Sequence, residues 1–483
     1  MSNFYRIVLF LLGLSAVNAV DNQRWIELEL FPVFVIGQER DIDSITLNDY
    51  VQHNKFMAIE FGFKLKGFEF FTAINLFQSP LGYADNTGLS NLPFFVSGTF
   101  DIADIFPDTP AEGFVEYRND NFDISAGRRR WALGYGEYNM ALSRQGLYND
   151  GFWFSLHPET AQGGRWHYDF LLAGDEGKIV EKLIRENTLG DMSATRWFAV
   201  HKIGYEGKSW RIGLSENMMI AELDLGTMLF MPIWHNLSLQ QLNDSFDLSF
   251  EKRFEHIRMY GDILMDDFTL PHEVNGGNPN AWGFYLGADV RLFDTPSFTG
   301  ISYDNYESLK AEDNFAFTDG FVLSFQAALT TRYVYWRNTS HPLGTFTMHR
   351  RVPNGIIENY IGFPYGNDVL MAKASATWNS TKFLARGGLT LLLLGHDNMV
   401  RYYTDNDYTI SNILPGDPVA STVQSDSNWF FSGIKTANLL FNPELYYALT
   451  HNISAYAGLN LRLVLNNIKY SNVVFNVGIY MNF

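Results

Sequence analysis

The sequence predicts an all-β transmembrane protein, an antiparallel outer-membrane β-barrel of about 16–18 strands with short inserted helices. Three observations predict this fold. Apolar residues recur at every second position in many separate runs, residues 1–19 have the composition of an export signal, and aromatic side chains make up 16% of the chain. The expected organisation is a cleaved signal peptide at 1–19 followed by one barrel domain at 20–483.

The run at residues 475–483 is the clearest predicted strand. Its odd-numbered positions, from Phe475 to Phe483, are all apolar, whereas the even-numbered positions hold Asn, Gly, Tyr and Asn. A period of two marks a strand with two different faces. A strand that ends on an aromatic residue is typical of the closing strand of an outer-membrane barrel, so we expect the barrel-assembly machinery to bind here through Phe483. The last strand of a soluble β-sandwich would carry the same local pattern.

The N-terminal stretch has the three parts of an export signal. Arg6 supplies a positive charge, residues 7–17 form an apolar run of 11, and Val17-Asn18-Ala19 offers small residues to a peptidase. The apolar run is too short to cross a bilayer as a helix, because a helical span needs about 20 residues. No other stretch approaches that length, which excludes a polytopic helical membrane protein.

Composition narrows the possible functions. The chain has no cysteine, which removes thiolate metal sites and cysteine nucleophiles. Its net charge of −18 argues against nucleic acid as a partner, because phosphate binding needs a positive surface. The 41 Phe, 25 Tyr and 11 Trp suit the two interfacial girdles of a barrel in outer-membrane lipid. Nothing in the sequence points to a cofactor.

Alternation recurs along most of the chain. At 57–65 the odd positions are large and apolar, whereas the even positions include Glu60 and Lys64; the same period marks 286–292 and 455–465. One apolar and one charged face suit a wall between lipid and a water-filled lumen. Short polar breaks and long loops rich in Gly, Pro and Asp separate the runs, as expected for a barrel with short turns at one end. Two segments have helical spacing instead, and we expect short helices near 178–187 and 232–243.

Three segments resemble the Wzi family of outer-membrane capsule-assembly proteins: residues 126–143, 213–268 and 361–378. The first resembles the family's basic strand through Arg128, Arg129, Arg130 and Trp131. The second matches a Ser-Glu pair, a Pro and His before a helix, and a Tyr-Gly strand ending in Asp-Asp-Phe, through Ser215, Glu216, Pro232, His235, Tyr260, Gly261, Asp266, Asp267 and Phe268. The third matches through Gly366 and Asp368.

The resemblance implies a monomeric barrel of about 18 strands with a small helical bundle, associated with surface polysaccharide in the bacterial outer membrane. On this basis the candidate polysaccharide or lumen contacts are Arg128, Arg129, Arg130, Trp131, Glu216, His235, Tyr260, Asp266 and Asp267.

The residue types in this set allow more than one chemistry. Asp266 and Asp267 are adjacent, so in a regular strand they face opposite ways and cannot form an acid–base pair without a bulge. Each then has three possible roles, which are a structural ion pair, a glycan or ion contact, and catalysis. Two of the three consecutive arginines share a face and could hold uronic-acid carboxylates, set the anion preference of a channel, or neutralise the barrel's own carboxylates.

The sequence leaves the function open between classes. No histidine pair has zinc-site spacing, and no nucleophile elbow is present. We therefore expect a non-enzymatic barrel that associates with or helps to assemble surface polysaccharide. The alternative is a porin-like channel for small solutes, and an outer-membrane enzyme or a structural component of the cell surface would share the same architecture.

Overall fold

The computed structural model describes residues 22–30, 33–37, 55–78, 105–143, 149–161, 163–174, 196–220, 241–267, 280–300, 317, 319–335, 346–352, 355–396, 398, 402–404, 430–466 and 472–482. These residues form 23 strands. None of them lies in a helix with the length and hydrophobicity of a membrane span.

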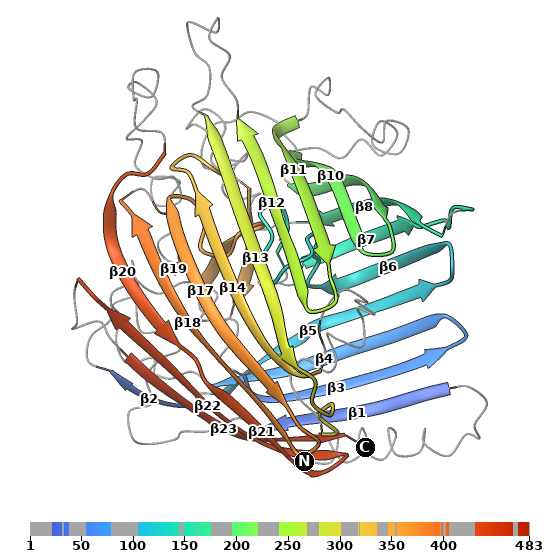
Figure 1. The fold of residues 1–483 in the computed structure, drawn as a ribbon, viewed down its shortest axis with the longest axis vertical. Helices are drawn as coiled ribbons and strands as arrows, with labels where there is room; N and C mark the ends of the chain where they lie inside the picture. Colours follow the sequence, from blue (N-terminus) through green and yellow to red (C-terminus); the bar gives the residue numbers. More distant parts are fainter. Residues whose placement is uncertain are drawn as a thin grey trace, which may run out of the picture.

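Most of the described strands belong to one large antiparallel sheet, which wraps around a central space (Figure 1). Its strands are β1 (Asn22–Leu30), β2 (Val33–Gly37), β3 (Lys55–Leu65), β4 (Phe68–Gln78), β5 (Ile105–Arg118), β6 (Phe122–Arg129), β7 (Asn149–Leu156), β8 (Arg165–Gly174), β9 (Trp197–Glu206), β10 (Trp210–Ile220), β11 (Gln241–Arg253), β12 (Ile257–Asp267), β13 (Ala281–Phe293), β14 (Phe321–Thr330), β17 (Val369–Asn379), β18 (Phe383–Gly395), β20 (Ile434–Phe441), β21 (Glu444–Thr450), β22 (Ile453–Val464) and β23 (Asn472–Asn482). A small sheet holds β15 (Thr347–Val352), β16 (Gly355–Tyr360) and β19 (Tyr402–Thr404).

The large sheet closes on itself. β1 pairs with β3 on one side and with β23 on the other. β1 and β2 both run along β23, and β20 and β21 both lie between β18 and β22, so each pair is one interrupted strand. Counted in this way, the 20 described segments make a closed barrel of 18 strands. The predicted fold class is therefore confirmed, and the count lies within the predicted range.

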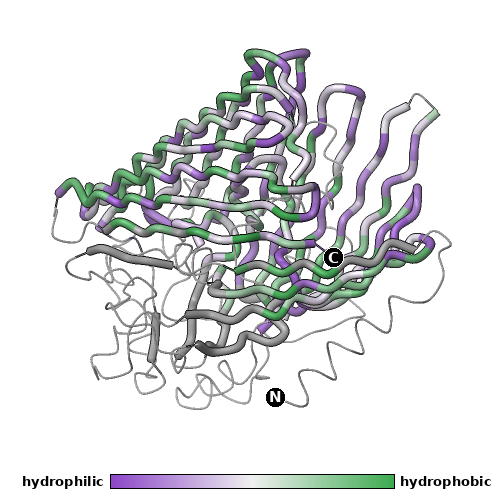
Figure 2. Tube along the Cα trace, turned by 90° about the horizontal axis from the view of Figure 1, so that it is seen from below, coloured by the Kyte–Doolittle hydropathy of each residue, from purple (hydrophilic) through white to green (hydrophobic). Residues whose placement is uncertain are grey.

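Period-two alternation separates an apolar outside from a polar inside. Along β10, Ile212 and Leu214 are exposed on the outer surface, whereas Ser215 and Asn217 are buried. Along β12 the exposed Ile263 lies between two buried, inward-facing residues, Asp262 and Leu264. Hydrophobic and hydrophilic positions alternate visibly along the strands (Figure 2). An apolar outer surface on a closed barrel is the surface that a lipid bilayer requires.

Aromatic side chains gather on the outer face near the short turns. Tyr205 lies between Trp166 and Trp210, with ring centroids 5.0 and 5.2 Å away, beside the turn between β9 and β10. Further aromatic pairs lie beside other short turns: Phe68–Tyr117, Tyr117–Phe122 and Phe383–Tyr447. The pair Phe293–Phe321 lies at the same end of the barrel, where β13 ends and β14 begins. Such a ring of aromatic residues marks a membrane interface.

Short turns join the strands at the end that carries this aromatic ring. Lys66 and Gly67 both have positive φ, 47° and 87°, which is the conformation of a two-residue hairpin whose twist matches its strands. In the next turn Asn119 Oδ1 accepts hydrogen bonds from the backbone N–H groups of Asn121 and Phe122 at 2.8 and 2.9 Å. Because short turns are periplasmic in outer-membrane barrels, we assign this end to the periplasm.

The two predicted helices have different outcomes. The range 178–187 lies outside the described residues, as does 232–240. Residues 241–243 belong to β11 and pair with β10, so the second helix cannot extend to Asn243 as predicted. The error arises because leucines at helical spacing run directly into a strand, and single-sequence periodicity locates such boundaries poorly.

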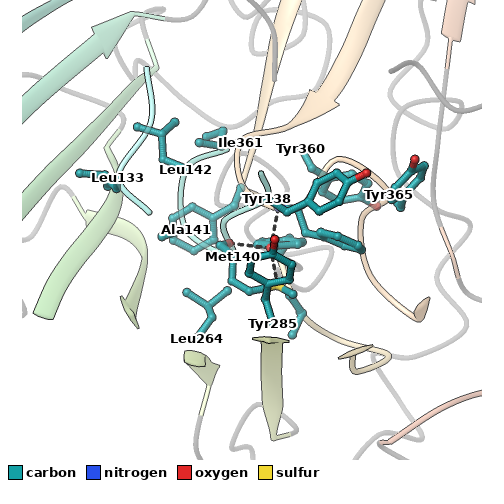
Figure 3. Close-up of a cluster of buried hydrophobic side chains, with 14 of the residues drawn as sticks. Leu133, Tyr138, Met140, Ala141, Leu142, Leu264, Tyr285, Tyr360, Ile361 and Tyr365 are labelled. Atoms are coloured by element: carbon teal, nitrogen blue, oxygen red, sulfur yellow. Dashed lines mark hydrogen bonds between the residues drawn. The ribbon is translucent and has the colours of Figure 1, made fainter. Parts of the chain in front are cut away.

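Part of the lumen is filled by the chain itself. Residues 131–143, named the inward segment from here on, leave the extracellular end of β6 and fold into the barrel. They pack with residues 331–335 and 360–369 into one buried cluster that also contains inward-facing wall residues such as Leu264, Tyr285 and Met371. Figure 3 shows Tyr138, Met140 and Ala141 of the segment among these side chains.

Candidate functional site

Aromatic stacking fixes the start of the inward segment. The indole of Trp131 stacks on that of Trp153 of β7, with 6.0 Å between ring centroids and 8° between ring planes. Its Nε1 donates a hydrogen bond to the carbonyl oxygen of Asn149 at 3.2 Å. Arg129 Cζ lies 5.2 Å from the centroid of Trp131 and 4.3 Å from that of Phe114, so a cation is sandwiched between two rings.

Buried polar groups fix the rest of the backbone of the segment. Asn139 Oδ1 accepts hydrogen bonds from the N–H groups of Ala141 and Leu142 at 2.9 and 2.7 Å, which forms a tight local turn. Asp262 of β12 accepts a bond from Met140 N at 2.7 Å, and Lys202 Nζ of β9 donates to the carbonyl oxygen of Leu133. Lumen-facing charges thus satisfy backbone groups that would otherwise be buried without partners.

The tip of the segment is residues 134–137, Gly-Tyr-Gly-Glu. Lys202 and Arg211 both face the ring of Tyr135, with cation-to-centroid distances of 4.6 and 4.3 Å. Arg258 donates to the carbonyl oxygen of Tyr135. Glu251 of β11 forms ion pairs with both Arg211 and Arg258. The tip therefore lies on a row of mixed charges from β9 to β12.

The row continues into β13. Arg258 Nη1 lies 3.3 Å from Asp289 Oδ2, and the hydroxyl of Tyr260 donates to Asp289 Oδ1 at 3.2 Å. Asp289 is therefore bound by two residues of β12, Arg258 and Tyr260. The predicted site residue Tyr260 thus faces the lumen, where it belongs to the charged network that holds the tip.

Glu137 fastens the tip to a more distant part of the wall. Lys373 Nζ of β17 lies 2.6 Å from both carboxylate oxygens of Glu137. Gln326 of β14 donates to Glu137 Oε2 at 3.1 Å and accepts a bond from the hydroxyl of Tyr285 at 3.1 Å. The side chain of Glu137 is 32% exposed and that of Lys373 is 10% exposed, so solvent reaches this ion pair.

Tyr335 connects the inward segment to the third buried stretch. Its hydroxyl donates to the carbonyl oxygen of Met140 at 2.6 Å and accepts a bond from Phe363 N at 2.9 Å. Its backbone N–H donates to Asp266 Oδ2 at 2.6 Å. Tyr335 lies beyond the end of β14, and its burial raises the pKa of the phenol well above its ordinary value. The hydroxyl therefore stays protonated and keeps both bonds.

The three predicted arginines have different environments. Arg128 lies on the outer face of β6, opposite Asp150, and forms a bidentate pair with it at 2.9 and 2.8 Å. Arg129 faces the lumen, where its Nη1 lies 2.8 Å from Glu116 Oε2. Arg130 follows the strand. The structure brings Arg129 and Trp131 together, but it places Arg128 outside the lumen because neighbours in a strand face opposite ways.

The other predicted site residues are scattered. Glu216 lies on the outward-facing side of β10, level with His201 of β9, and is buried there, so it is not a lumen contact as predicted. A register shift between Met265 and Asp267 makes Asp266 the extra residue of a β-bulge, and its side chain is buried. His235 and the side chain of Asp267 lie outside the described residues. Contact of any of these residues with polysaccharide stays a prediction.

An acidic wall lies on strands β3 to β5. Four buried glutamates belong to it: Glu60, Glu69, Glu112 and Glu116. Register places Glu69 directly opposite Glu116. Lys64 lies 3.1 Å from Glu69, and Arg118 and Arg129 both pair with Glu116. The lumen thus combines an acidic wall with the mixed row of charges beneath the tip. Within the described ranges no three His, Asp or Glu side chains are grouped as metal ligands would be.

Sequence reasoning missed the side chains that hold the tip. Arg211, Glu251, Arg258 and Lys373 lie in β10, β11, β12 and β17. Their alternation with outward-facing apolar residues is the signal that could have identified them as lumen residues. The sequence offered no signal that Glu137, in a glycine-rich turn, would join them.

Four features together indicate the cellular location. They are the closed barrel, its apolar outer surface, the ring of aromatic residues at the short turns and the charged lumen. The protein is an outer-membrane β-barrel. It spans the outer membrane of a bacterium, with its short turns in the periplasm and its outer face in lipid.

No protein-family model and no curated protein matches the chain. Among solved structures, it is similar to OccK11 (OpdR) of Pseudomonas aeruginosa, with 7% identity, 96% of this chain and 95% of that chain covered, and a TM-score of 0.44. Pseudomonas aeruginosa OpdK with vanillate gives 7% identity, coverages of 96% and 98%, and a TM-score of 0.43. A triple mutant of the Rhodopseudomonas blastica porin gives 7% identity, coverages of 96% and 99%, and a TM-score of 0.35.

Proposed function

We propose that the protein is a gated, non-enzymatic channel for small polar solutes, with the tip of the inward segment as its moving part. One observation carries the proposal. The end of the tip is held by the ion pair between Glu137 and Lys373, whose carboxylate side chain is 32% exposed, whereas the flanks of the tip are held by buried apolar packing and buried hydrogen bonds. An ion pair that solvent reaches separates more readily than close-packed buried contacts, because water and salt can replace its partners.

The composition of the tip supports motion there. Gly134 and Gly136 flank Tyr135, and glycine accepts a wider range of backbone conformations than any other residue. Displacement of the tip would expose Lys202, Arg211 and Arg258 on one wall, facing the acidic wall of β3 to β5. Such opposed charges would orient a polar solute and select among ions.

The lumen groups act in this proposal through charge and position rather than as catalysts. Glu251 and Asp289 are each engaged by an arginine, and Glu137 by a lysine and an amide. Engaged carboxylates of this kind stabilise a conformation and shape the field in the lumen. A transferred proton or a covalent intermediate has no part in the proposal.

Single-channel conductance of the refolded barrel in a planar bilayer tests this function. We expect discrete openings that become longer in Glu137→Gln and in Lys373→Met, because either change removes the ion pair that holds the tip. The matched control is Lys252→Met, which removes a lysine that contacts Ser209 at the periplasmic end. A barrel that stays closed in every variant contradicts the channel.

A second candidate is association with surface polysaccharide, which the resemblance to the Wzi family implies. One observation favours it. The buried apolar cluster fills part of the lumen, as expected in a barrel that binds a polymer instead of conducting. Conductance with and without an acidic polysaccharide separates the two, since a closed barrel that binds the polymer supports attachment and an open pore that ignores it supports the channel. Unchanged cell-retained polysaccharide after deletion of the gene would count against attachment.

A further inference from the structure

The connection between β13 and β14 differs from the other turns at the periplasmic end. Strands there are joined by short hairpins such as Lys66-Gly67, whereas β13 ends at Phe293 and β14 begins only at Phe321. The first described part of this connection, residues 294–300, is named the periplasmic strap. Arg291 forms ion pairs with Asp294 and Asp319 at 3.2 Å each, which holds both ends of the connection beside β13.

The strap reaches strands far from its own. Thr299 donates two hydrogen bonds to the carbonyl oxygen of Thr381, from its backbone N at 3.1 Å and from Oγ1 at 2.7 Å. Thr381 belongs to the turn between β17 and β18, and Gly300 is buried against Ala448 and Ser454 of β21 and β22. β21 is four ladder spacings from β13, roughly 19 Å, and seven extended residues span at most about 23 Å. The strap is therefore nearly extended along the periplasmic mouth.

The strap ends on a cluster of tyrosines inside the barrel. Tyr446, Tyr456 and Tyr480 come from β21, β22 and β23, and their ring centroids lie 4.9, 5.6 and 6.0 Å apart in pairs. Phe298 packs against this cluster and is itself half-buried. Arg386 Cζ lies 5.1 Å from the centroid of Tyr446 and pairs with Glu444 at 3.1 Å. The strap thus places one aromatic ring on an aromatic patch of the lumen wall.

The strap has few other described attachments. Asp294, Pro296, Ser297 and Thr299 are exposed, whereas Phe298 and Gly300 supply its packing. Both hydrogen bonds of Thr299 end on a single carbonyl oxygen. The described contacts of the strap with these distant strands come from Phe298, Thr299 and Gly300. None of these contacts belongs to the barrel ladder, so the strap can separate from the wall without disturbing that ladder.

We propose that the periplasmic strap is a lid over the periplasmic mouth, latched by Phe298 on the tyrosine cluster. Closing brings the ring onto Tyr446, Tyr456 and Tyr480, and opening swings the strap about its ion-paired end at Arg291. The lumen then has two closures, the inward segment nearer the extracellular end and the strap at the other. The closure part of this proposal rests on the proposed channel function, because it is tested by conductance. The latch itself does not depend on that function.

Cysteine cross-linking tests the latch without any need for conduction. The chain has no cysteine, so Thr299→Cys with Thr381→Cys introduces its only two thiols. Both positions are exposed, and a cysteine side chain has nearly the size of threonine. Residues that share a backbone hydrogen bond in this way have the separation that a disulfide bridges. We expect the disulfide to form readily, and about 3- to 10-fold more slowly when Phe298→Ala is added, which is the effect of losing one aromatic contact.

Phe254→Ala is the matched control, because it deletes an exposed phenylalanine from another periplasmic turn. It should leave the cross-linking rate unchanged. An equal rate in the Phe298→Ala and Phe254→Ala backgrounds overturns the latch.

Conductance tests the closure. The oxidised Thr299→Cys/Thr381→Cys barrel should open less often than the reduced one, and a reductant should restore the openings. Equal conductance in both redox states overturns the lid. A barrel that conducts in neither state, while its cross-linking rate still responds to Phe298→Ala, contradicts the channel function and supports the latch.

Discussion

Lys373→Met is the most informative perturbation of the inward segment. The change removes the ammonium group that lies 2.6 Å from both carboxylate oxygens of Glu137 and leaves an unbranched side chain of similar length. A hydrogen bond to a charged group contributes about 1.5–3 kcal/mol, and partial exposure of Glu137 places this pair near the lower part of that range. We take about 2 kcal/mol for the pair. That value corresponds to about a 30-fold shift in the ratio of held to released tip.

A double-mutant cycle measures this value directly. Glu137→Gln, Lys373→Met and the double variant are compared with the unmodified barrel by the mean duration of closures in single-channel recordings. We expect each single change to shorten closures by about 10- to 30-fold, and a coupling of about 1–2 kcal/mol between the two sites. Gln326 still donates to residue 137 in Glu137→Gln, so the loss there should be the smaller one.

Additive effects of the two changes would refute the reasoning. Additivity would mean that Glu137 and Lys373 act independently and that the 2.6 Å contact does not hold the tip. Closures that last as long in Lys373→Met as in Lys252→Met would refute it equally, because Lys252 lies at the other end of the barrel.

Three further predictions concern stability, measured by urea unfolding in detergent micelles. Trp131→Ala should lower the free energy of unfolding by about 3 kcal/mol, because the stacked indole is buried, whereas Trp166→Ala on the outer face should lower it by less. Asp266→Ala should lower the free energy of unfolding by about 1–3 kcal/mol, because it leaves the N–H of Tyr335 without its acceptor. Asp266→Asn should lower it by less, because the amide oxygen can still accept this bond. Equal losses in the two variants would contradict the role of Asp266 as that acceptor. Burial raises the pKa of Tyr335, so the stability from its neutral hydroxyl is fully present below about pH 10, the ordinary tyrosine value, and is lost as pH rises further. Tyr335→Phe should therefore be less stable at pH 8 but lose less stability between pH 9 and 12, and an identical alkaline loss would contradict this.

Local periodicity was sufficient to predict the wall of the barrel. The run at 57–65 became β3, and the runs at 286–292 and 455–465 became parts of β13 and β22. A strand has a side-chain period of two whatever its partners are. The apolar positions of a single run therefore indicate which of its residues face lipid. Strand number, the aromatic ring at the short turns and the outer-membrane location follow from the sum of these local patterns.

Alternation also has limits, which Glu216, Arg128 and Asp266 illustrate. The first two are polar residues that share the parity of lipid-facing neighbours, so residue type alone indicates the lumen whereas the strand period places them outside it. Asp266 occupies a β-bulge, where one extra residue interrupts the period on a single strand. No pattern within one strand reveals a bulge, because a bulge is a property of the pair.

The sequence by itself determined the fold class, the polar and apolar faces and the girdle of this protein, because all three arise from residues close together in the chain. Tertiary structure alone decided the candidate site. Glu137 and Lys373 are 236 positions apart, and Tyr335 meets Met140 across 195 positions. Such contacts exist only after the sheet closes and sets the register of every strand, and closure is a property of all 18 strands together.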